Sequence, residues 1–382
     1  MKARNLMGAL ALAIVAIVFV PADAWTDDGN RLKILESRLV ALESENAALR
    51  EQVADLKATI LPAVAIGALV KVVEGEINGL AGPHLIIEGA NLHVRSGSGR
   101  TDDNGALTGL GNLVIGYNEL SGTPVLGRTG SHNLIVGRWH EYSSFGGLVA
   151  GSRNTISGPN SSVTGGAGNT ASGYASGVGG GRWNVASADY ASASGGYENT
   201  ASGYASSVSG GQSNEASGTS ASVSGGYENT SSGYASGVGG GRGNLAGADY
   251  ASVSGGYENT ASGYASSVSG GQSNEASGTS ASVSGGYENT ASGDAASVGG
   301  GQWNLASNYY ASVSGGYENT ASGYAASMSG GRSNQASGTS ASVSGGYDNT
   351  ASGDLASVSG GQSNEASGSY DWRGGSCYFC EE

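Results

Sequence analysis

An asparagine recurs at every fifteenth position through more than half of the chain. A period that never slips indicates one small structural unit stacked many times, in which each unit packs only against its neighbours. The members of this series are Asn154, Asn169, Asn184, Asn199, Asn214, Asn229, Asn244, Asn259, Asn274, Asn289, Asn304, Asn319, Asn334, Asn349 and Asn364. Because each unit repeats nearly the same residues, few positions remain from which a unique active site could be built.

The repeat unit, represented by residues 221–235, contains two short runs in which small or apolar residues alternate with polar ones. The residues on the two inward faces are Ala221, Val223, Gly225, Asn229, Ser231 and Gly233. Such alternation predicts two short β-strands per coil, with a turn at the intervening glycine pair. We therefore expect an all-β repeat, a parallel β-roll or β-solenoid with 15-residue coils, over residues 151–368. The inward asparagines would form a structural ladder along the stack, because buried amides must be hydrogen-bonded.

Composition is consistent with an ordered repeat. The 70 glycines do not fall at every third residue, which excludes collagen, and valine recurs at a fixed phase of the repeat. The formal net charge of −14 argues against nucleic acid as a partner, since phosphate binding needs clustered Lys and Arg.

Residues 1–24 have the pattern of a signal peptide. Lys2 and Arg4 precede an apolar run from Leu6 to Val20, and Ala22-Asp23-Ala24 fits a cleavage site. The alternative, an uncleaved membrane anchor, needs an apolar run of about 20 residues. We therefore expect a secreted, extracellular or cell-surface protein with no transmembrane segment in the mature chain.

Residues 25–61 carry a heptad repeat, which predicts an α-helical parallel coiled-coil stalk that ends at Pro62. Its a and d positions are Leu32, Leu35, Leu39, Leu42, Asn46, Leu49, Val53, Leu56 and Ile60. Asn46 would fix the register, because a buried amide must find its partner on a neighbouring chain. Leucine at every d position favours a dimer, whereas the mixture of Leu, Val and Ile at a weakens that preference.

Residues 62–150 form an irregular β transition domain. Leu85–Ile87 indicates a buried strand, and Asn112–Gly116 is repeated by Asn133–Gly137 and then by Gly147–Gly151. These segments are expected to be early coils of the same stack with loops inserted.

Residues 369–382 would form a C-terminal cap. Aromatic residues such as Trp372 would cover the open end of the stack, which otherwise leaves strand edges unpaired. Cys377 and Cys380 would form a disulfide, within the chain or between chains.

The array resembles the head repeats of trimeric autotransporter adhesins. The resemblance is carried by runs such as Ala-Ser-Val-Ser-Gly at 221–225 and Asn-Thr-Ala-Ser-Gly at 199–203, and it covers more than half of the chain. It implies a left-handed parallel β-roll in which three chains pack side by side, so that a trimer is favoured and a dimer is the alternative. The chain departs from that family in two ways. The coiled coil precedes the repeats, and the family's C-terminal membrane anchor has no counterpart after Ser369.

Tyrosines two positions before every second asparagine form a candidate binding surface, because tyrosine supplies a large amphipathic contact area. They are Tyr197, Tyr227, Tyr257, Tyr287, Tyr317 and Tyr347. A second aromatic set comprises Tyr174, Tyr204, Tyr234, Tyr264, Tyr309 and Tyr324. Repetition of a weak site would give avidity. Alternatively, these rings cover turns or fill grooves between chains.

Catalytic, cofactor-binding and metal-binding patterns are not found. All four histidines precede the array, and there is no nucleophile elbow or phosphate-binding loop. We expect no enzyme activity, cofactor or metal. The sequence favours an oligomeric fibrous protein, structural or adhesive, whose partner is an extracellular protein or glycan. The alternatives are an ice-binding β-solenoid and a filament or matrix subunit with no specific ligand.

Overall fold

The computed structural model describes residues 28–120 and 127–375. Contacts divide the chain into two compact units at the boundary between His93 and Val94.

The N-terminal unit consists of one long helix and a hairpin. Helix α2 (Asp28–Leu69) leads directly into β1 (Val70–Val73), which pairs antiparallel with β2 (His84–Ile87). The predicted end of the helix at Pro62 is wrong. The helix continues to Leu69, because the residues after Pro62 are mainly alanine and other apolar residues that tolerate helical geometry. Within the described residues, no helix has the length and apolarity needed to span a membrane.

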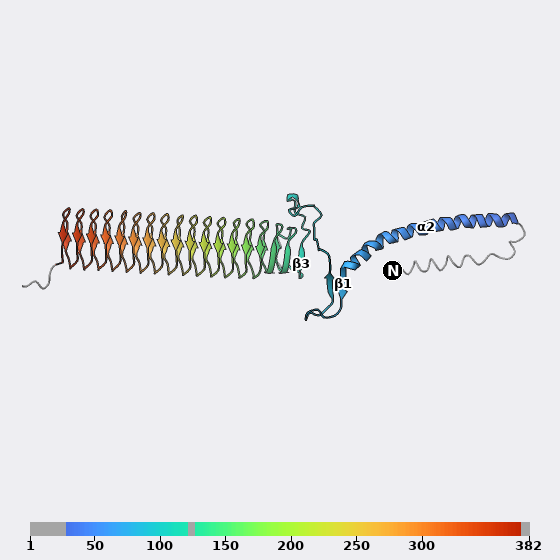
Figure 1. Cartoon of the computed structure of the whole chain (residues 1–382), viewed down its shortest axis with the longest axis horizontal. Helices are drawn as coiled ribbons and strands as arrows, with labels where there is room; N and C mark the ends of the chain where they lie inside the picture. The colour runs from blue at the N-terminus through green and yellow to red at the C-terminus, as the bar shows by residue number, and fades with distance from the viewer. Residues whose placement is uncertain (1–27, 121–126, 376–382) are drawn as a thin grey trace, which may run out of the picture. The chain divides into compact units, whose positions relative to one another are not determined.

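The second unit is a parallel β-solenoid of about 16 turns. Figure 1 shows its coils stacked in one row from β3 (Leu113–Ile115) to the last coil. Before the first coil, Asp103–Gly105 forms a short 3₁₀ turn (η2).

From β4 onward, successive strands alternate between two parallel sheets. The first sheet starts at β3 and continues through β4 (Leu134–Arg138), β6 (Leu148–Ser152), β8 (Ser162–Val163), β10 (Gly177–Val178), β12 (Ser192–Ala193), β14 (Ser207–Val208), β16 (Ser222–Val223), β18 (Gly237–Val238), β20 (Ser252–Val253), β22 (Ser267–Val268), β24 (Ser282–Val283), β26 (Ser297–Val298), β28 (Ser312–Val313), β30 (Ser327–Met328), β32 (Ser342–Val343), β34 (Ser357–Val358) and β36 (Trp372–Arg373). Among the described residues β3 pairs only with β4, and β36 pairs only with β34, so this sheet is open at both ends.

The second sheet consists of the remaining strands. They are β5 (Glu141–Tyr142), β7 (Thr155–Ile156), β9 (Thr170–Ala171), β11 (Val185–Ala186), β13 (Thr200–Ala201), β15 (Glu215–Ala216), β17 (Thr230–Ser231), β19 (Leu245–Ala246), β21 (Thr260–Ala261), β23 (Glu275–Ala276), β25 (Thr290–Ala291), β27 (Leu305–Ala306), β29 (Thr320–Ala321), β31 (Gln335–Ala336), β33 (Thr350–Ala351) and β35 (Glu365–Ala366). A third line of parallel β-bridges joins the residues two positions before the asparagines, for example Tyr227 to Arg242 and Arg242 to Tyr257. Each coil therefore has three sides.

The predicted early coils at Leu113, Leu134 and Leu148 are confirmed. Leu85–Ile87, expected to be a buried early coil, is not one: it lies in β2, which pairs antiparallel with β1, and Leu85 is 70% exposed. Leu113 pairs in register with Leu134, and Leu134 with Leu148, although the two spacings in the sequence are unequal. The parallel register is therefore kept despite the unequal spacing. The solenoid therefore begins at β3, well before the strict period of the asparagines is visible.

Small residues fill the interior because the coil is narrow. Val223 and Ala221 are 1% exposed, and Ser231, which replaces the usual alanine, is fully buried. Its hydroxyl lies 2.6 Å from that of Ser236, so the polar substitution is compensated inside the same coil. Gly225, predicted to face inward, is only half-buried, because it already belongs to the turn.

Glycine is required at the next position of that turn. Gly226 has a φ of +92°, a left-handed conformation that glycine adopts readily. A Cβ atom there would lie 2.2 Å from the carbonyl oxygen of Gly241 in the next coil and 2.5 Å from Nδ2 of Asn229. The glycine thus permits close stacking of the coils and contact with the asparagine.

The asparagines line the interior as a continuous hydrogen-bonded ladder. The backbone N–H of Asn229 donates to Oδ1 of Asn214 at 3.0 Å. Its Nδ2 donates to Gly225 O at 2.9 Å and to Gly241 O, in the following coil, at 3.0 Å. Its Oδ1 accepts the backbone N–H of Asn244, so one fully buried amide satisfies backbone groups of two successive coils.

Candidate functional site

The tyrosines two positions before alternate asparagines lie along one edge of the solenoid, in the line of bridges. Here they alternate with Arg or Gln, and we call this the Tyr/Arg edge. The guanidinium carbon of Arg242 lies 5.1 Å from the ring centre of Tyr227 and 5.7 Å from that of Tyr257. Arg332 lies at the same two distances from Tyr317 and Tyr347. Each of these two arginines thus makes cation–π contacts with a pair of tyrosines that lie two coils apart.

Elsewhere along the Tyr/Arg edge, a tryptophan ring packs against the tyrosines in place of an arginine. The Trp303 ring lies edge-to-face between Tyr287 and Tyr317, with centres 5.8 and 4.9 Å away, and its Nε1 donates to the Glu288 carboxylate at 2.6 Å. Trp183 contacts Tyr197 in the same manner at 5.4 Å.

Acidic residues that directly follow these tyrosines interact with them. A hydrogen bond to the Glu228 carboxylate, together with its negative charge, raises the pKa of Tyr227. Hydrogen bonds from Tyr287 and then Trp303 lower the pKa of Glu288. For Tyr197, burial is the largest cause of a raised pKa, and the charge of Glu198 adds to it.

Most of these tyrosines are therefore engaged within the chain. Tyr197, Tyr227, Tyr257, Tyr287 and Tyr317 are half-buried, whereas Tyr347, near the last coil, is 45% exposed. The Tyr/Arg edge packs its rings against neighbouring coils.

A second edge exposes aromatic rings much more strongly, and we call it the Tyr edge. It carries the second aromatic set of the sequence together with three tyrosines that the spacing did not reveal. Its members, each between 42% and 58% exposed, are Tyr174, Tyr190, Tyr204, Tyr234, Tyr250, Tyr264, Tyr309, Tyr310 and Tyr324.

The Tyr edge is divided into clusters by a longer period. Tyr190 contacts both Tyr174 and Tyr204 edge-to-face at 5.5 Å. Tyr234, Tyr250 and Tyr264 repeat this arrangement four coils later, at 5.4 and 5.5 Å. A third cluster contains Tyr309, Tyr310 and Tyr324, with centres 6.3 and 5.9 Å apart. Four coils therefore form one larger unit, and in the first two units three coils carry tyrosine while the fourth does not.

The fourth coil carries threonine and serine at these positions. Thr219, Thr279 and Thr339 occupy it in successive units, and all three are exposed. Four acids of the Tyr edge accept backbone N–H groups, and two of them lie beside these threonines. Oδ1 of Asp294 accepts the N–H of Thr279 at 2.9 Å, and Oδ1 of Asp354 accepts that of Thr339 at 3.0 Å. These bonds fix the carboxylates beside the threonines.

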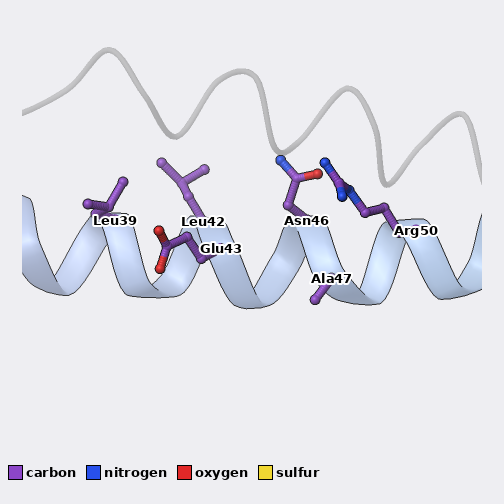
Figure 2. Close-up of a pocket in the computed structure, with 6 residues that line it drawn as sticks. All are labelled: Leu39, Leu42, Glu43, Asn46, Ala47 and Arg50. Atoms are coloured by element: carbon purple, nitrogen blue, oxygen red, sulfur yellow. The ribbon is translucent and has the colours of Figure 1, made fainter.

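On the N-terminal unit, the candidate oligomerisation residue lies in an apolar stripe. Figure 2 shows Leu39, Leu42, Asn46 and Arg50 projecting from the same side of α2, with Ala47 pointing away from them. Leu39 and Leu42 are 57% and 49% exposed. The structure thus places Asn46 within an uncovered row of leucines.

Ionisable residues at the start of the solenoid are structural. Hydrogen bonds from the Ser131 and Ser96 hydroxyls hold the pKa of the buried Asp103 carboxyl far below its usual range. His140 is fully buried. Its Nε2 donates to Val136 O at 3.0 Å, its Nδ1 accepts the Asn154 N–H at 3.3 Å, and burial lowers its pKa. The hydrogen bonds of Asp103 and His140 are thus made within the start of the solenoid.

Two groups of expected residues lie outside the described part of the chain. They are the signal-peptide residues 1–24 and the cysteines Cys377 and Cys380. Within the described ranges, no group of three or more His, Cys, Asp or Glu side chains is placed to hold a metal ion. Trp372, predicted to cover the end of the stack, is 65% exposed, and its Nε1 donates to Ser359 Oγ at 3.0 Å.

Comparison with known proteins does not assign the chain to a family. No protein-family model matches the chain, and no curated protein sequence is significantly similar to it.

Proposed function

We propose that the protein is an exported, oligomeric fibre that joins a coiled-coil stalk to a rigid adhesive or structural shaft, and that it is not an enzyme. The observation that carries this proposal is the uncovered leucine stripe of α2. Leu35, Leu42, Leu49 and Leu56, all at d positions, are between 42% and 62% exposed. A lone helix with such a stripe is stabilised by covering it, and identical chains supply the matching surface.

Charges beside the stripe support parallel chains in register. In a parallel coiled coil a g residue lies near the e residue five positions later on the other chain. Arg38 would meet Glu43, and Glu45 would meet Arg50, so both pairs attract. Asn46 would meet Asn46 of the other chain, whereas an antiparallel arrangement would place it against leucine.

The outward face of the first sheet supports side-by-side packing of the shafts. From β8 to β34 every outward strand residue is Ser or Gly. A chain with a net charge of −14 repels its copies, so a long face free of charge is where they can approach. At the first coils the same face is apolar, with Leu113, Leu134 and Leu148 in one rank.

The finer features of this proposal follow the adhesin resemblance. Three chains are favoured over two, and the coils are left-handed. The localisation does not follow from that resemblance: the signal-peptide pattern of residues 1–24 would direct the chain to the cell surface or the extracellular medium. Cys377 and Cys380 would lock the C-terminal ends by a disulfide, within or between chains. The ligand would be an extracellular protein or glycan.

A solid-phase binding screen tests the adhesive role. The full chain and a variant lacking residues 151–368 would be compared on immobilised matrix proteins and glycans. Binding that depends on these coils supports adhesion by the shaft. Equal binding by both proteins would place the adhesive site outside residues 151–368. No binding by either protein would reject the adhesive role and favour a purely structural one.

Ice binding is the weaker proposal. Such activity needs flat, regular ranks of threonine, and the second sheet presents Thr200, Thr230 and Thr260 outward only on alternate coils. Glu215 and Leu245 lie between them and break the rank. A thermal hysteresis assay on the purified protein would reveal this activity directly.

A further inference from the structure

The Tyr edge contains three slots, each spanning two coils. Slot 1 has Tyr204 and Tyr234 as walls and Thr219 between them. In slot 2 Tyr264 and Asp294 flank Thr279, and in slot 3 Tyr324 and Asp354 flank Thr339. In every slot one wall belongs to the coil before the threonine and the other to the coil after it. The two wall residues are therefore two coils apart, roughly 9–10 Å for coils stacked at the spacing of adjacent strands.

The walls are braced from outside the slots. Tyr204 packs against Tyr190, and Tyr234 packs against Tyr250 on the opposite side. Tyr264 is held by Tyr250 and Tyr324 by Tyr310, with ring centres 5.5 and 5.9 Å apart. The floor is a small, exposed threonine. Each slot is therefore open to solvent, with at least one aromatic wall held in place.

The chain itself shows what fits such a space. On the Tyr/Arg edge, Tyr227 and Tyr257 are also two coils apart, and the guanidinium group of Arg242 lies between their rings at 5.1 and 5.7 Å. Arg332 repeats this between Tyr317 and Tyr347. In slot 1 the small, exposed Thr219 stands at the position, midway between two tyrosines two coils apart, that the arginine occupies on the other edge.

The charges around the slots are complementary to a cation. Asp294 and Asp354 replace one ring in slots 2 and 3, and each is fixed by a backbone N–H. The chain as a whole carries a net charge of −14. A planar guanidinium stacks on an aromatic face and pairs with a carboxylate more effectively than an ammonium does.

We propose that these three slots bind arginine side chains presented by a basic polypeptide partner. This rests on the adhesive role proposed for the shaft and deepens it by naming the partner's chemistry. The slots recur every four coils, which is about 19 Å at the spacing of adjacent strands. An extended peptide spans at most about 3.3 Å per residue, so arginines six or more residues apart reach neighbouring slots and bind with avidity.

The test measures binding of a labelled peptide to the full-length protein by fluorescence anisotropy. The peptide carries three arginines separated by six Gly/Ser residues, and a second peptide carries lysines instead. We expect the arginine peptide to bind more tightly. A variant with Tyr204→Ser, Tyr264→Ser and Tyr324→Ser removes one ring from each slot without changing the net charge, and it should weaken binding at least tenfold.

Two further variants separate the proposed contact from general charge attraction and from misfolding. Tyr204→Phe, Tyr264→Phe and Tyr324→Phe keep the rings and should bind within twofold of the parent. Thr219→Tyr, Thr279→Tyr and Thr339→Tyr fill the slots with a residue that this position carries in other coils, and they should weaken binding as the serine variant does. Unchanged binding after filling, or equal loss in the phenylalanine variant, would overturn the proposal. A negative result here leaves the oligomeric fibre untouched, since its mass is measured independently.

Discussion

The asparagine amide holds successive coils together through contacts that no other side chain can reproduce. In the middle of the array, Oδ1 of Asn259 accepts the backbone N–H of Asn274 at 3.0 Å. Nδ2 of Asn259 donates to Gly255 O at 2.9 Å and Gly271 O at 3.0 Å. Aspartate lacks the two donors, and glutamine is longer than the space allows. This requirement explains why the residue does not vary through fifteen coils.

The position of an asparagine in the array should determine the effect of its removal. We expect Asn259→Ala to lower the free energy of unfolding by about 2–4 kcal/mol, because it leaves a buried N–H and two glycine carbonyls without that partner. Asn364→Ala is the matched control. It has no asparagine fifteen residues later, and among the described residues its Nδ2 donates only to Gly360 O, at 2.8 Å, so a loss of about 1 kcal/mol is expected. Urea denaturation measures both changes, and equal losses would contradict the ladder.

A serine pair offers a second comparison between single residues. The Ser176 hydroxyl is buried without a hydrogen-bond partner, whereas that of Ser236 donates to Gly233 O at 2.8 Å and lies beside Ser231. Ser176→Ala should therefore stabilise the chain by about 1 kcal/mol, and Ser236→Ala should destabilise it by a similar amount. Thermal unfolding of the two variants would show opposite shifts. Shifts of the same sign would contradict this account.

At the scale of elements, the sequence predicts the parts whose signal is periodic. Alternation at Ala221 and Val223 indicates a strand, and Gly226 marks the turn after it. The third side of the coil has only one bridging residue, such as Tyr227, and a single residue carries no alternation. The phase of Tyr190, Tyr250 and Tyr310 is offset by one residue from the other tyrosines, so the clusters of the Tyr edge become visible only when the coils are stacked.

Some elements depend on context that a local pattern does not contain. Pro62 predicts an end of α2, yet the helix passes through it, since a proline removes one hydrogen bond but does not prevent its neighbours from continuing. Left-handed backbone at non-glycine residues is also invisible in the sequence. Ala265 and Glu258 both have φ of +53°, which the stacking of adjacent coils imposes.

Helix α2 should respond to replacement of its polar a residue. We expect Asn46→Ile to raise the melting temperature of the coiled coil, because an apolar side chain packs better at this position. The same change should broaden the distribution of oligomers, because the amide no longer selects the register. Circular dichroism follows the melting, and native mass spectrometry follows the distribution. A variant with unchanged melting and one oligomer would argue against a buried Asn46.

For the whole molecule, stability is a sum of coils and of contacts between neighbours. Deleting residues 229–288 removes one complete four-coil unit and joins Glu228 to Asn289, which recreates a native Tyr-Glu-Asn-Thr sequence. We expect this shortened chain to fold with nearly the same melting temperature. Deleting residues 229–281, which does not remove a whole number of coils, should disrupt stacking at the junction. Equal stability of the two deletions would contradict an in-register array.

The central claim is that the chain assembles through α2 into a fibre of parallel copies. Light scattering of the purified, exported protein measures this directly, because the mass of the particle divided by the mass of one chain gives the number of copies. We expect a ratio of three, and a ratio of one when Leu42 and Leu49 are both replaced by Asp. A parent protein with the mass of a single chain would contradict the account.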